Sequence, residues 1–331
     1  MENIKNLKAN LESKILSSSN VVIVPHNGID FDAIGSAIGL ASIVKKLKKV
    51  PIIVVDDPYS KMDYGVSLVI EEAKNEYSIV NKDKYLQNAD PDDLFILTDV
   101  NKSYLVSVNE SLTNPDNIVI IDHHNEDDKT VNSNLKCIDP SISSASEIVT
   151  HLLNLFKCKC SPEVANYLLT GIYLDTNKLT KNVTPETMKT VAKLLEYGAN
   201  INKVTDLLSE DFLSDRRVQE LVSKAKITTY SIAMILAEEE DEYTKEELAK
   251  AADYLLKYRV DAAFSVGRID EETISVSARS KEKINVGMVM QQLEGGGNQY
   301  SAATKLKDTT IEETGKKLIK LLQPNHYVMG E

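Results

Sequence analysis

The sequence predicts an α/β protein in which a parallel-sheet domain is joined by a helical linker to a smaller α/β domain. The first half of the chain contains short, continuous apolar runs, which are typical of strands buried on both faces. Longer amphipathic segments lie between some of these runs, as expected of a parallel sheet with crossover helices. After about residue 211 the pattern changes, and the 331-residue chain is long enough to form a second core.

The first domain is predicted at residues 1–211. Its β-branched runs predict four strands, and an amphipathic segment at residues 33–48 predicts a helix between the first two. Residues 143–208 have a mostly helical pattern. The predicted strands are residues 21–25, 51–57, 94–100 and 117–124.

The second, smaller domain is predicted at residues 226–331, after a connecting helix at residues 212–225. Strand-like and helix-like patterns alternate along it. The predicted strands are residues 227–237, 260–270 and 273–280, and the predicted helices are residues 244–257 and 310–322.

Composition and charge exclude several classes of function. The apolar runs are far shorter than the ~20 residues that cross a bilayer, and the polar start "MENIKNLKAN" lacks the apolar core of a signal peptide. We therefore expect a cytoplasmic protein with no membrane partner. The net charge of -12 opposes binding to duplex nucleic acid, so we expect a small nucleotide or a very short strand as substrate. The three cysteines form no disulfide framework, although the pair at residues 158–160 leaves metal binding as an alternative.

Histidine and acidic side chains lie at or just beyond the ends of three of the four predicted strands. Because the carboxyl ends of parallel strands meet at one edge of a sheet, these side chains can converge. A further aspartate lies in the polar break "LDTN" of the helical region. The set is His26, Asp30 and Asp32 after the first strand, Asp99 at the end of the third, Asp122, His123 and His124 at the end of the fourth, and Asp175.

Imidazole and carboxylate ligands together suit a divalent ion such as Mn²⁺. A site with two ions ~3.5–4 Å apart needs several carboxylates, at least one of them bridging, and such a pair activates water and neutralises phosphate. The HxxxDxD spacing alone is a weak signal, but "DHH" at a strand end is rarer, and three of the five histidines lie in these two motifs. We interpret His151 as structural and His326 as having no role.

The second domain contains "LEGGGNQYSAAT", in which three consecutive glycines allow close approach of a ligand to the backbone. A flexible hairpin turn is the alternative interpretation. The segment "SVSARS" adds a possible phosphate contact. The candidate substrate-binding residues are Arg279, Ser280, Gly295, Gly296, Gly297 and Asn298, with Arg268 as a weaker candidate.

These motifs together resemble the DHH–DHHA1 family of phosphoesterases over nearly the whole chain. The resemblance rests on "PHNGIDFDAIGSAIG", "LTDV", "DHH", "SSASE", "GIYLDTN" and "GGGNQYSAAT". Within the family, "LEGGGN" and "AAT" look more like the catalytic part of membrane-anchored cyclic di-AMP phosphodiesterases than like single-strand DNA exonucleases. The resemblance implies that residues 1–211 are the catalytic DHH domain and residues 226–331 a substrate-binding DHHA1 domain.

The resemblance also implies two Mn²⁺ ions per chain. It assigns His26 and Asp30 to one ion, Asp32 and His123 to the other, and Asp99 as the bridge; Asp175 completes the cluster. His124 would contact the scissile phosphate or assist the leaving oxygen, and Asp122 would orient the histidines. One departure concerns substrate binding, since the family usually has histidine where this chain has Asn298, and asparagine cannot carry a proton or a charge.

Three functions follow as hypotheses. The first is a Mn²⁺-dependent phosphodiesterase acting on cyclic di-AMP or linear pApA. The second is an oligoribonuclease for RNAs of two to five residues that also dephosphorylates 3'-phosphoadenosine 5'-phosphate. The third is a nucleotide sensor without hydrolysis, which the full ligand set argues against. The family resemblance makes a homodimer plausible.

Overall fold

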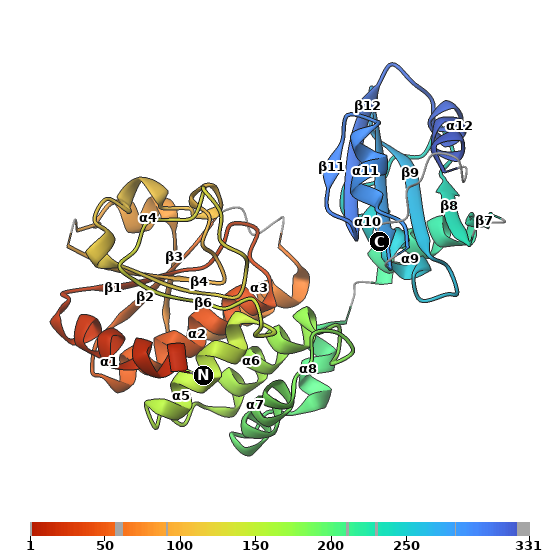
Figure 1. Cartoon of the computed structure of the whole chain (residues 1–331). Helices are drawn as coiled ribbons and strands as arrows, with labels where there is room; N and C mark the ends of the chain where they lie inside the picture. The colour runs from red at the N-terminus through yellow and green to blue at the C-terminus, as the bar shows by residue number, and fades with distance from the viewer. Residues whose placement is uncertain are drawn as a thin grey trace. The chain divides into compact units, whose positions relative to one another are not determined.

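The computed structural model describes residues 2–56, 62–90, 92–209, 212–228, 231–281 and 283–322. The chain divides into two compact units, Met1–Ser209 and Glu210–Glu331 (Figure 1). Parts of several predicted segments lie outside the described residues: residue 57 of the second predicted strand, residues 229–230 of the strand at 227–237, the domain end at residue 211, and the tail with His326.

In the described part of the first unit, six parallel strands form one sheet in the order β3-β2-β1-β4-β5-β6. This confirms the predicted α/β class with a parallel sheet. The four predicted strands are its four central strands. The bounds are β1 Val21–Val24, β2 Pro51–Val55, β3 Ser78–Asn81, β4 Leu94–Thr98, β5 Ile118–Asp122 and β6 Leu135–Ile138.

The sheet is buried on both faces, which explains the continuous apolar runs. Along β1, Val21 and Ile23 belong to the core on one face, whereas Val22 and Val24 belong to the core on the other. Helices α1, α2, α5 and α6 cover the first face, and α4 lies on the second (Figure 1). The helices of this unit are α1 Glu2–Ser17, α2 Phe31–Lys46, α3 Tyr64–Ala73, α4 Lys82–Leu86, α5 Ala145–Leu155, α6 Pro162–Asp175, α7 Pro185–Glu196 and α8 Ile201–Leu207.

The two strands that the sequence did not predict, β3 and β6, are the edges of the sheet. Each has only one buried residue, Ile79 in β3 and Cys137 in β6. An edge strand needs no continuous apolar run because part of it faces solvent, so its signal in the sequence is weak.

The strand order reverses direction between β1 and β4, which are neighbours in the sheet. From β1 the chain adds strands on one side, and from β4 it adds them on the other. In open parallel sheets the crevice beyond the carboxyl ends of the strands at such a reversal is the usual ligand site. The segments after β1 and β4 are those that contain His26, Asp30 and Asp99.

Helix α2 is buried over most of its length and packs closely on α5 and α6. Small residues allow this contact: a Cβ added at Gly35 would lie 2.6 Å from the carbonyl oxygen of Tyr167 on α6. The "AIGSAIG" segment is therefore a packing surface for helices as well as the start of a helix at the site.

The described part of the second unit contains a mixed sheet in the order β11-β12-β10-β9-β8-β7. Strands β8 and β9 are parallel and the other pairs are antiparallel. Helix α10 packs on β9 and β10, and α12 packs against β8 and β9. The strands are β7 Lys226–Ile227, β8 Ile232–Leu236, β9 Ala262–Asp270, β10 Thr273–Ser280, β11 Gly296–Gly297 and β12 Ser301–Lys307; the helices are α9 Phe212–Ser223, α10 Lys245–Leu255, α11 Val286–Gln291 and α12 Ile311–Leu321.

Helix α9, which occupies the predicted connecting segment, packs as part of the second unit. Val218 and Leu221 are buried in the core of that unit, and α9 contacts α10. Among the described residues, none of the helices is both long enough and apolar enough to span a membrane.

Candidate metal centre

The first ligand candidates follow β1. The Nδ1 atom of His26 lies 2.9 Å from the carbonyl oxygen of Asn27. When Nδ1 carries the proton and donates it to this carbonyl, the lone pair of Nε2 remains available for a metal. Nε2 lies 3.6 Å from Oδ2 of Asp30 and 3.5 Å from Oδ2 of Asp99.

Asp30 is the N-cap of α2. Its Oδ1 accepts hydrogen bonds from the backbone N–H groups of Asp32, at 2.9 Å, and Ala33, at 3.0 Å. The side chain is therefore fixed by one oxygen while the other faces His26. The start of the helix thus both ends the loop after β1 and aims a carboxylate oxygen at the site.

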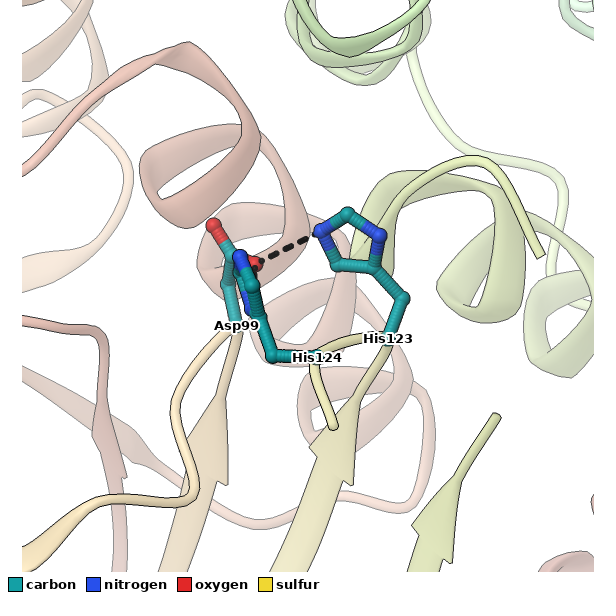
Figure 2. Close-up of side chains that lie close together, drawn as sticks. All are labelled: Asp99, His123 and His124. Carbon is teal, nitrogen blue, oxygen red and sulfur yellow. Dashed lines mark ion pairs between the residues drawn. The ribbon is translucent and has the colours of Figure 1, made fainter. Parts of the chain in front are cut away.

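Asp99 lies between the two histidine motifs. Its Oδ2 faces His26, and its Oδ1 lies 3.4 Å from Nε2 of His123 (Figure 2). The residue is 3% exposed, and Oδ1 has no hydrogen-bond partner among the described residues. The backbone of Asp99 is left-handed, with φ of 57°, a conformation that aspartate tolerates better than most residues. A buried carboxylate oxygen without a donor, aimed at a histidine, is suited to a cation.

Asp122 arranges the DHH segment at the end of β5. Its Oδ1 accepts hydrogen bonds from the backbone N–H groups of His123, at 2.7 Å, and His124, at 3.2 Å. The same oxygen lies 2.9 Å from Nδ1 of His124. Asp122 is fully buried, whereas the side chain of His124 is 57% exposed. The buried carboxylate therefore fixes the ring of His124 by one nitrogen and leaves Nε2 for a partner outside the protein.

Asp32 and Asp175 both lie close to His123. Nε2 of His123 lies 3.2 Å from Oδ2 of Asp175, the last residue of α6, and 3.9 Å from Oδ2 of Asp32. Asp32 is fully buried, and the N-terminus of α5 binds its carboxylate: Ala145 N–H donates to Oδ2 at 2.7 Å and Ser146 N–H donates to Oδ1 at 2.8 Å. The free amides of a helix start favour negative charge there.

The ligand atoms fall into three overlapping groups, each within 4.8 Å. Asp99 belongs to two of them, as does His123. A carboxylate shared by two groups is what a pair of divalent ions with a bridging ligand requires, and the nitrogen and oxygen donors fit such ions. The groups are His26, Asp30 and Asp99; Asp32, His123 and Asp175; and Asp99, His123 and His124.

The pKa values of the clustered residues also favour a cation site. Burial alone would lower the pKa of His26, but Asp30 and Asp99 outweigh it and raise the pKa to about 11. The pKa of His123 is also raised to about 11, because Asp175, Asp99 and Asp32 outweigh its burial. Burial and neighbouring carboxylates raise the pKa values of Asp32 and Asp175. The cluster thus requires positive charge, which protons on the histidines supply when metal ions do not.

A pocket of about 460 Å³ opens beside this cluster. Its lining includes His26, Asp99 and His124 together with the loop that follows β4. A second pocket, of about 470 Å³, is lined by His123, His124 and the segment before α5. Both pockets are formed within the first unit, and both are large enough for part of a small ligand.

The structure therefore brings together all eight sequence-predicted residues of the first unit. Sequence reasoning did not identify the two backbone amides that hold Asp32, nor the loop after β4 that lines the pocket. The only signal for the amides is the capping pattern Ser144-x-x-Glu147, in which Ser144 caps α5. That pattern predicts where a helix begins but not what its free amides bind.

The candidate residues of the second unit have partners within that unit. Arg279 Nε donates to Oδ2 of Asp253 at 2.9 Å, and buried Ser280 Oγ donates to the carbonyl of Asp261 at 3.2 Å. Asn298 Oδ1 accepts from the N–H groups of Tyr300, at 2.8 Å, and Ser301, at 2.9 Å. These contacts explain the residues structurally and leave substrate binding as a proposal.

The three glycines have different roles in the backbone. A Cβ at Gly295 would lie 2.4 Å from the carbonyl oxygen of Ala303, and Gly297 has φ of 139°. Gly296 has open space around it. Gly296 and Gly297 form β11, which pairs with β12. The hairpin interpretation of this segment therefore has a physical basis.

Comparison with known families gives two matches. The DHH family, N-terminal domain, matches residues 20–172, and the DHHA1 domain matches residues 226–324. The two matches fall in the two compact units and include most of the motifs described above.

Curated proteins with similar sequences include two phosphodiesterases. The cyclic-di-AMP phosphodiesterase GdpP of Geobacillus thermodenitrificans is 32% identical over 93% of this chain and 48% of its own length. The cyclic-di-AMP phosphodiesterase PdeA of Listeria monocytogenes is 31% identical over 97% of this chain and 50% of its own length. The chain thus spans about half the length of these relatives.

The bifunctional oligoribonuclease and PAP phosphatase NrnA of Thermus thermophilus is 26% identical over 92% of this chain and 89% of its own length. Among solved structures, an exopolyphosphatase-related protein from Bacteroides fragilis has the same fold, with a TM-score of 0.78, 22% identity and 96% coverage of both chains.

We predict that metal uptake near pH 7.5 releases protons. In the metal-free protein the raised pKa values keep His26 and His123 protonated at this pH, whereas a metal ligand must be a neutral imidazole. Titration with Mn²⁺ by calorimetry in two buffers of different ionisation enthalpy should give different heats, and the apparent affinity should fall as the pH falls. A His26→Gln variant should release fewer protons, and His151→Gln should release as many as the wild type. Equal heats in both buffers would contradict this prediction.

We also predict that Gly171→Ala weakens metal binding. A Cβ at this position would lie 2.5 Å from Oγ of Ser146 and 2.8 Å from Cα and Oδ1 of Asp32, so the carboxylate must move. Displacing the support of a ligand typically lowers metal affinity roughly 10- to 100-fold.

Gly39→Ala is the matched control, because its Cβ would crowd only side chains of Val149 and Leu168 at the same helix interface. Calorimetry should show weaker Mn²⁺ binding for Gly171→Ala alone. Equal weakening in both variants would show that helix packing, and not the position of Asp32, is responsible.

Proposed function

The chain belongs to the DHH family and has a DHHA1 domain, and from this premise we propose that it is a Mn²⁺-dependent phosphodiesterase. Its substrates would be cyclic di-AMP or linear pApA, and its products 5'-phosphorylated adenosine nucleotides. The observation that carries the proposal is Asp99, a buried carboxylate whose two oxygens face His26 and His123. The GdpP and PdeA relatives, named as cyclic-di-AMP phosphodiesterases, support the choice of substrate.

The residues fit a pair of divalent ions, which when bound activate water and neutralise charge on phosphate. One group of ligands would come from the loops after β1 and β4, and the other from α2, the end of β5 and α6. These groups are His26, Asp30 and Asp99, and Asp32, His123 and Asp175.

His124 would act on the substrate directly. Its hydrogen bond with Asp122 raises its pKa and so favours the protonated form of the ring. Nε2 is then a donor that can contact a phosphate oxygen or give a proton to the leaving oxygen. Asp122 would act through His124 by fixing its ring, and through the backbone amides that set the DHH turn.

The second candidate is an enzyme for very short RNAs that also removes phosphate from 3'-phosphoadenosine 5'-phosphate. The NrnA relative, named as a bifunctional oligoribonuclease and PAP phosphatase and 26% identical over 92% of this chain, supports it. The two candidates share the same metal centre and differ in substrate.

We predict that Asp99→Ala abolishes turnover, because it removes the only carboxylate shared between the ligand groups of the described residues. Activity should fall at least about 100-fold, since even partners of metal ligands are commonly worth roughly 10- to 100-fold. Asp92→Ala, at an exposed aspartate before β4, is the control and should keep the wild-type rate. An Asp99→Ala protein that is folded and retains more than a few per cent of the activity would contradict the assignment.

Chromatography of products can separate the candidate functions. The purified protein with Mn²⁺ would be incubated separately with cyclic di-AMP, pApA, a mixed-base dinucleotide and 3'-phosphoadenosine 5'-phosphate. We expect turnover of cyclic di-AMP at a rate comparable with that of pApA. Turnover of linear substrates alone, with tolerance of different bases, would instead indicate the short-RNA enzyme. No turnover of any of the four would contradict hydrolysis and favour a nucleotide sensor.

A further inference from the structure

The pocket beside the metal-ligand cluster has a wall that supplies no metal ligand. This wall is the loop after β4, residues 100–105, which includes a short 3₁₀ turn at Ser103–Leu105. Val100 is buried, and Tyr104 and Leu105 are exposed. The rest of the pocket lining consists of histidine and aspartate residues and Asn125. The loop therefore adds side chains that are not metal ligands to the same pocket.

Asn101 contributes an unsatisfied acceptor to this wall. Its side chain is 1% exposed and lines the pocket. Its Nδ2 donates to the carbonyl oxygen of His124 at 3.2 Å, which fixes the orientation of the amide. Its Oδ1 is buried and has no hydrogen-bond partner among the described residues. Burying an unpaired acceptor is unfavourable, so this oxygen is suited to a donor supplied by whatever occupies the pocket.

Only some groups of a nucleotide can donate a hydrogen bond to Oδ1 of Asn101. A phosphate diester has only acceptor oxygens and cannot donate to Oδ1, whereas a sugar hydroxyl can. Asn101 is hydrogen-bonded to the backbone of His124 and lies two residues after Asp99. A group bound there would be a near neighbour of a phosphate at the metal centre, which is where the sugar of a nucleotide lies.

Tyr104 presents an aromatic ring farther along the same wall. The residue is 63% exposed, and Nζ of Lys129 lies 5.6 Å from its ring centroid. Apart from the histidines, Tyr104 is the aromatic residue among those that line the pocket. Nucleobases stack on exposed aromatic rings with little dependence on base identity.

We propose that residues 100–105 form a nucleoside subsite, in which Tyr104 stacks on a base and Oδ1 of Asn101 accepts a hydrogen bond from a ribose hydroxyl. This inference rests on the proposed function, because it assumes that a nucleotide phosphate binds at the metal centre. It adds to that function the residues that recognise the nucleoside next to the phosphate.

Binding measurements on the Mn²⁺-loaded protein test the stacking part. Calorimetry with adenosine 5'-monophosphate and with ribose 5-phosphate compares a ligand that has the base with one in which an anomeric hydroxyl replaces it. We expect the nucleotide to bind more tightly by roughly 5- to 150-fold, the range given by base–aromatic stacking. Tyr104→Ala should remove most of this preference, and Tyr104→Phe should keep it. Tyr64→Ala, at an exposed tyrosine of α3 outside the pocket, is the matched control.

The hydroxyl contact has its own test. Wild-type protein should bind adenosine 5'-monophosphate roughly 2- to 12-fold more tightly than its 2'-deoxy or its 3'-deoxy form, the range of one hydrogen bond. Asn101→Leu should abolish this difference. Because displacement of His124 would weaken all these ligands alike, the ratio between them reports on the lost acceptor and not on a purely structural effect.

Hydrolysis of pApA, measured in parallel, tests the proposed function separately from the nucleoside subsite. If the wild type hydrolyses pApA but neither the base preference in Tyr104→Ala nor the ribose preference in Asn101→Leu changes, the subsite is wrong and the proposed function stands. A water molecule as the partner of Asn101 would produce that same unchanged ribose preference. If the wild type hydrolyses no nucleotide, the proposed function is wrong and the subsite falls with it.

Discussion

Four aspartates buried or half-buried around two histidines are the constraint on which the first unit depends. Burial, together with repulsion between neighbouring carboxylates, raises the pKa values of Asp32 and Asp175. The raised pKa values of His26 and His123 record the complementary demand for positive charge. A divalent cation supplies that positive charge while leaving the histidines neutral. The arrangement is therefore unfavourable in the metal-free protein and favourable for binding a metal ion.

The fold holds this arrangement with its backbone more than with its side chains. The N-terminal amides of α5 hold Asp32, those of α2 hold Asp30, and the amides of the DHH turn are held by Asp122. Gly171 allows α6 to approach Asp32 closely, so that Asp175 at the end of that helix reaches the cluster. The left-handed backbone of Asp99, which is unfavourable by roughly 1–2 kcal/mol, persists because β4 is paired on both sides within the sheet.

The sequence predicts the parts of this arrangement that depend on residue type and strand position. Val21–Val24 and Leu94–Thr98 are continuous apolar runs because they lie in the middle of the sheet, and the ligands follow from the ends of those runs. The edge strand at Ser78–Asn81 leaves no such trace. The capping pattern at Ser144 marks the start of α5 but not what its amides bind, because any residue except proline supplies a backbone donor. For Arg279, residue type alone suggested phosphate binding. The structure pairs it with Asp253 through a contact between β10 and α10, which sequence spacing does not reveal.

The position of the DHH turn between two hollows links the architecture to the proposed chemistry. His124 and Asn125 line both the pocket that contains Tyr104 and the pocket that contains Ser143 and Thr184. In displacement at phosphorus, the attacking and leaving oxygens are roughly in line on opposite sides of the transferred group. A phosphodiester also has two ester arms, and two adjoining pockets offer each arm a separate place. Under the proposed function, a histidine fixed by a buried carboxylate at the boundary of two pockets would let each arm of a diester enter a different pocket while the phosphate stays beside the metal ligands.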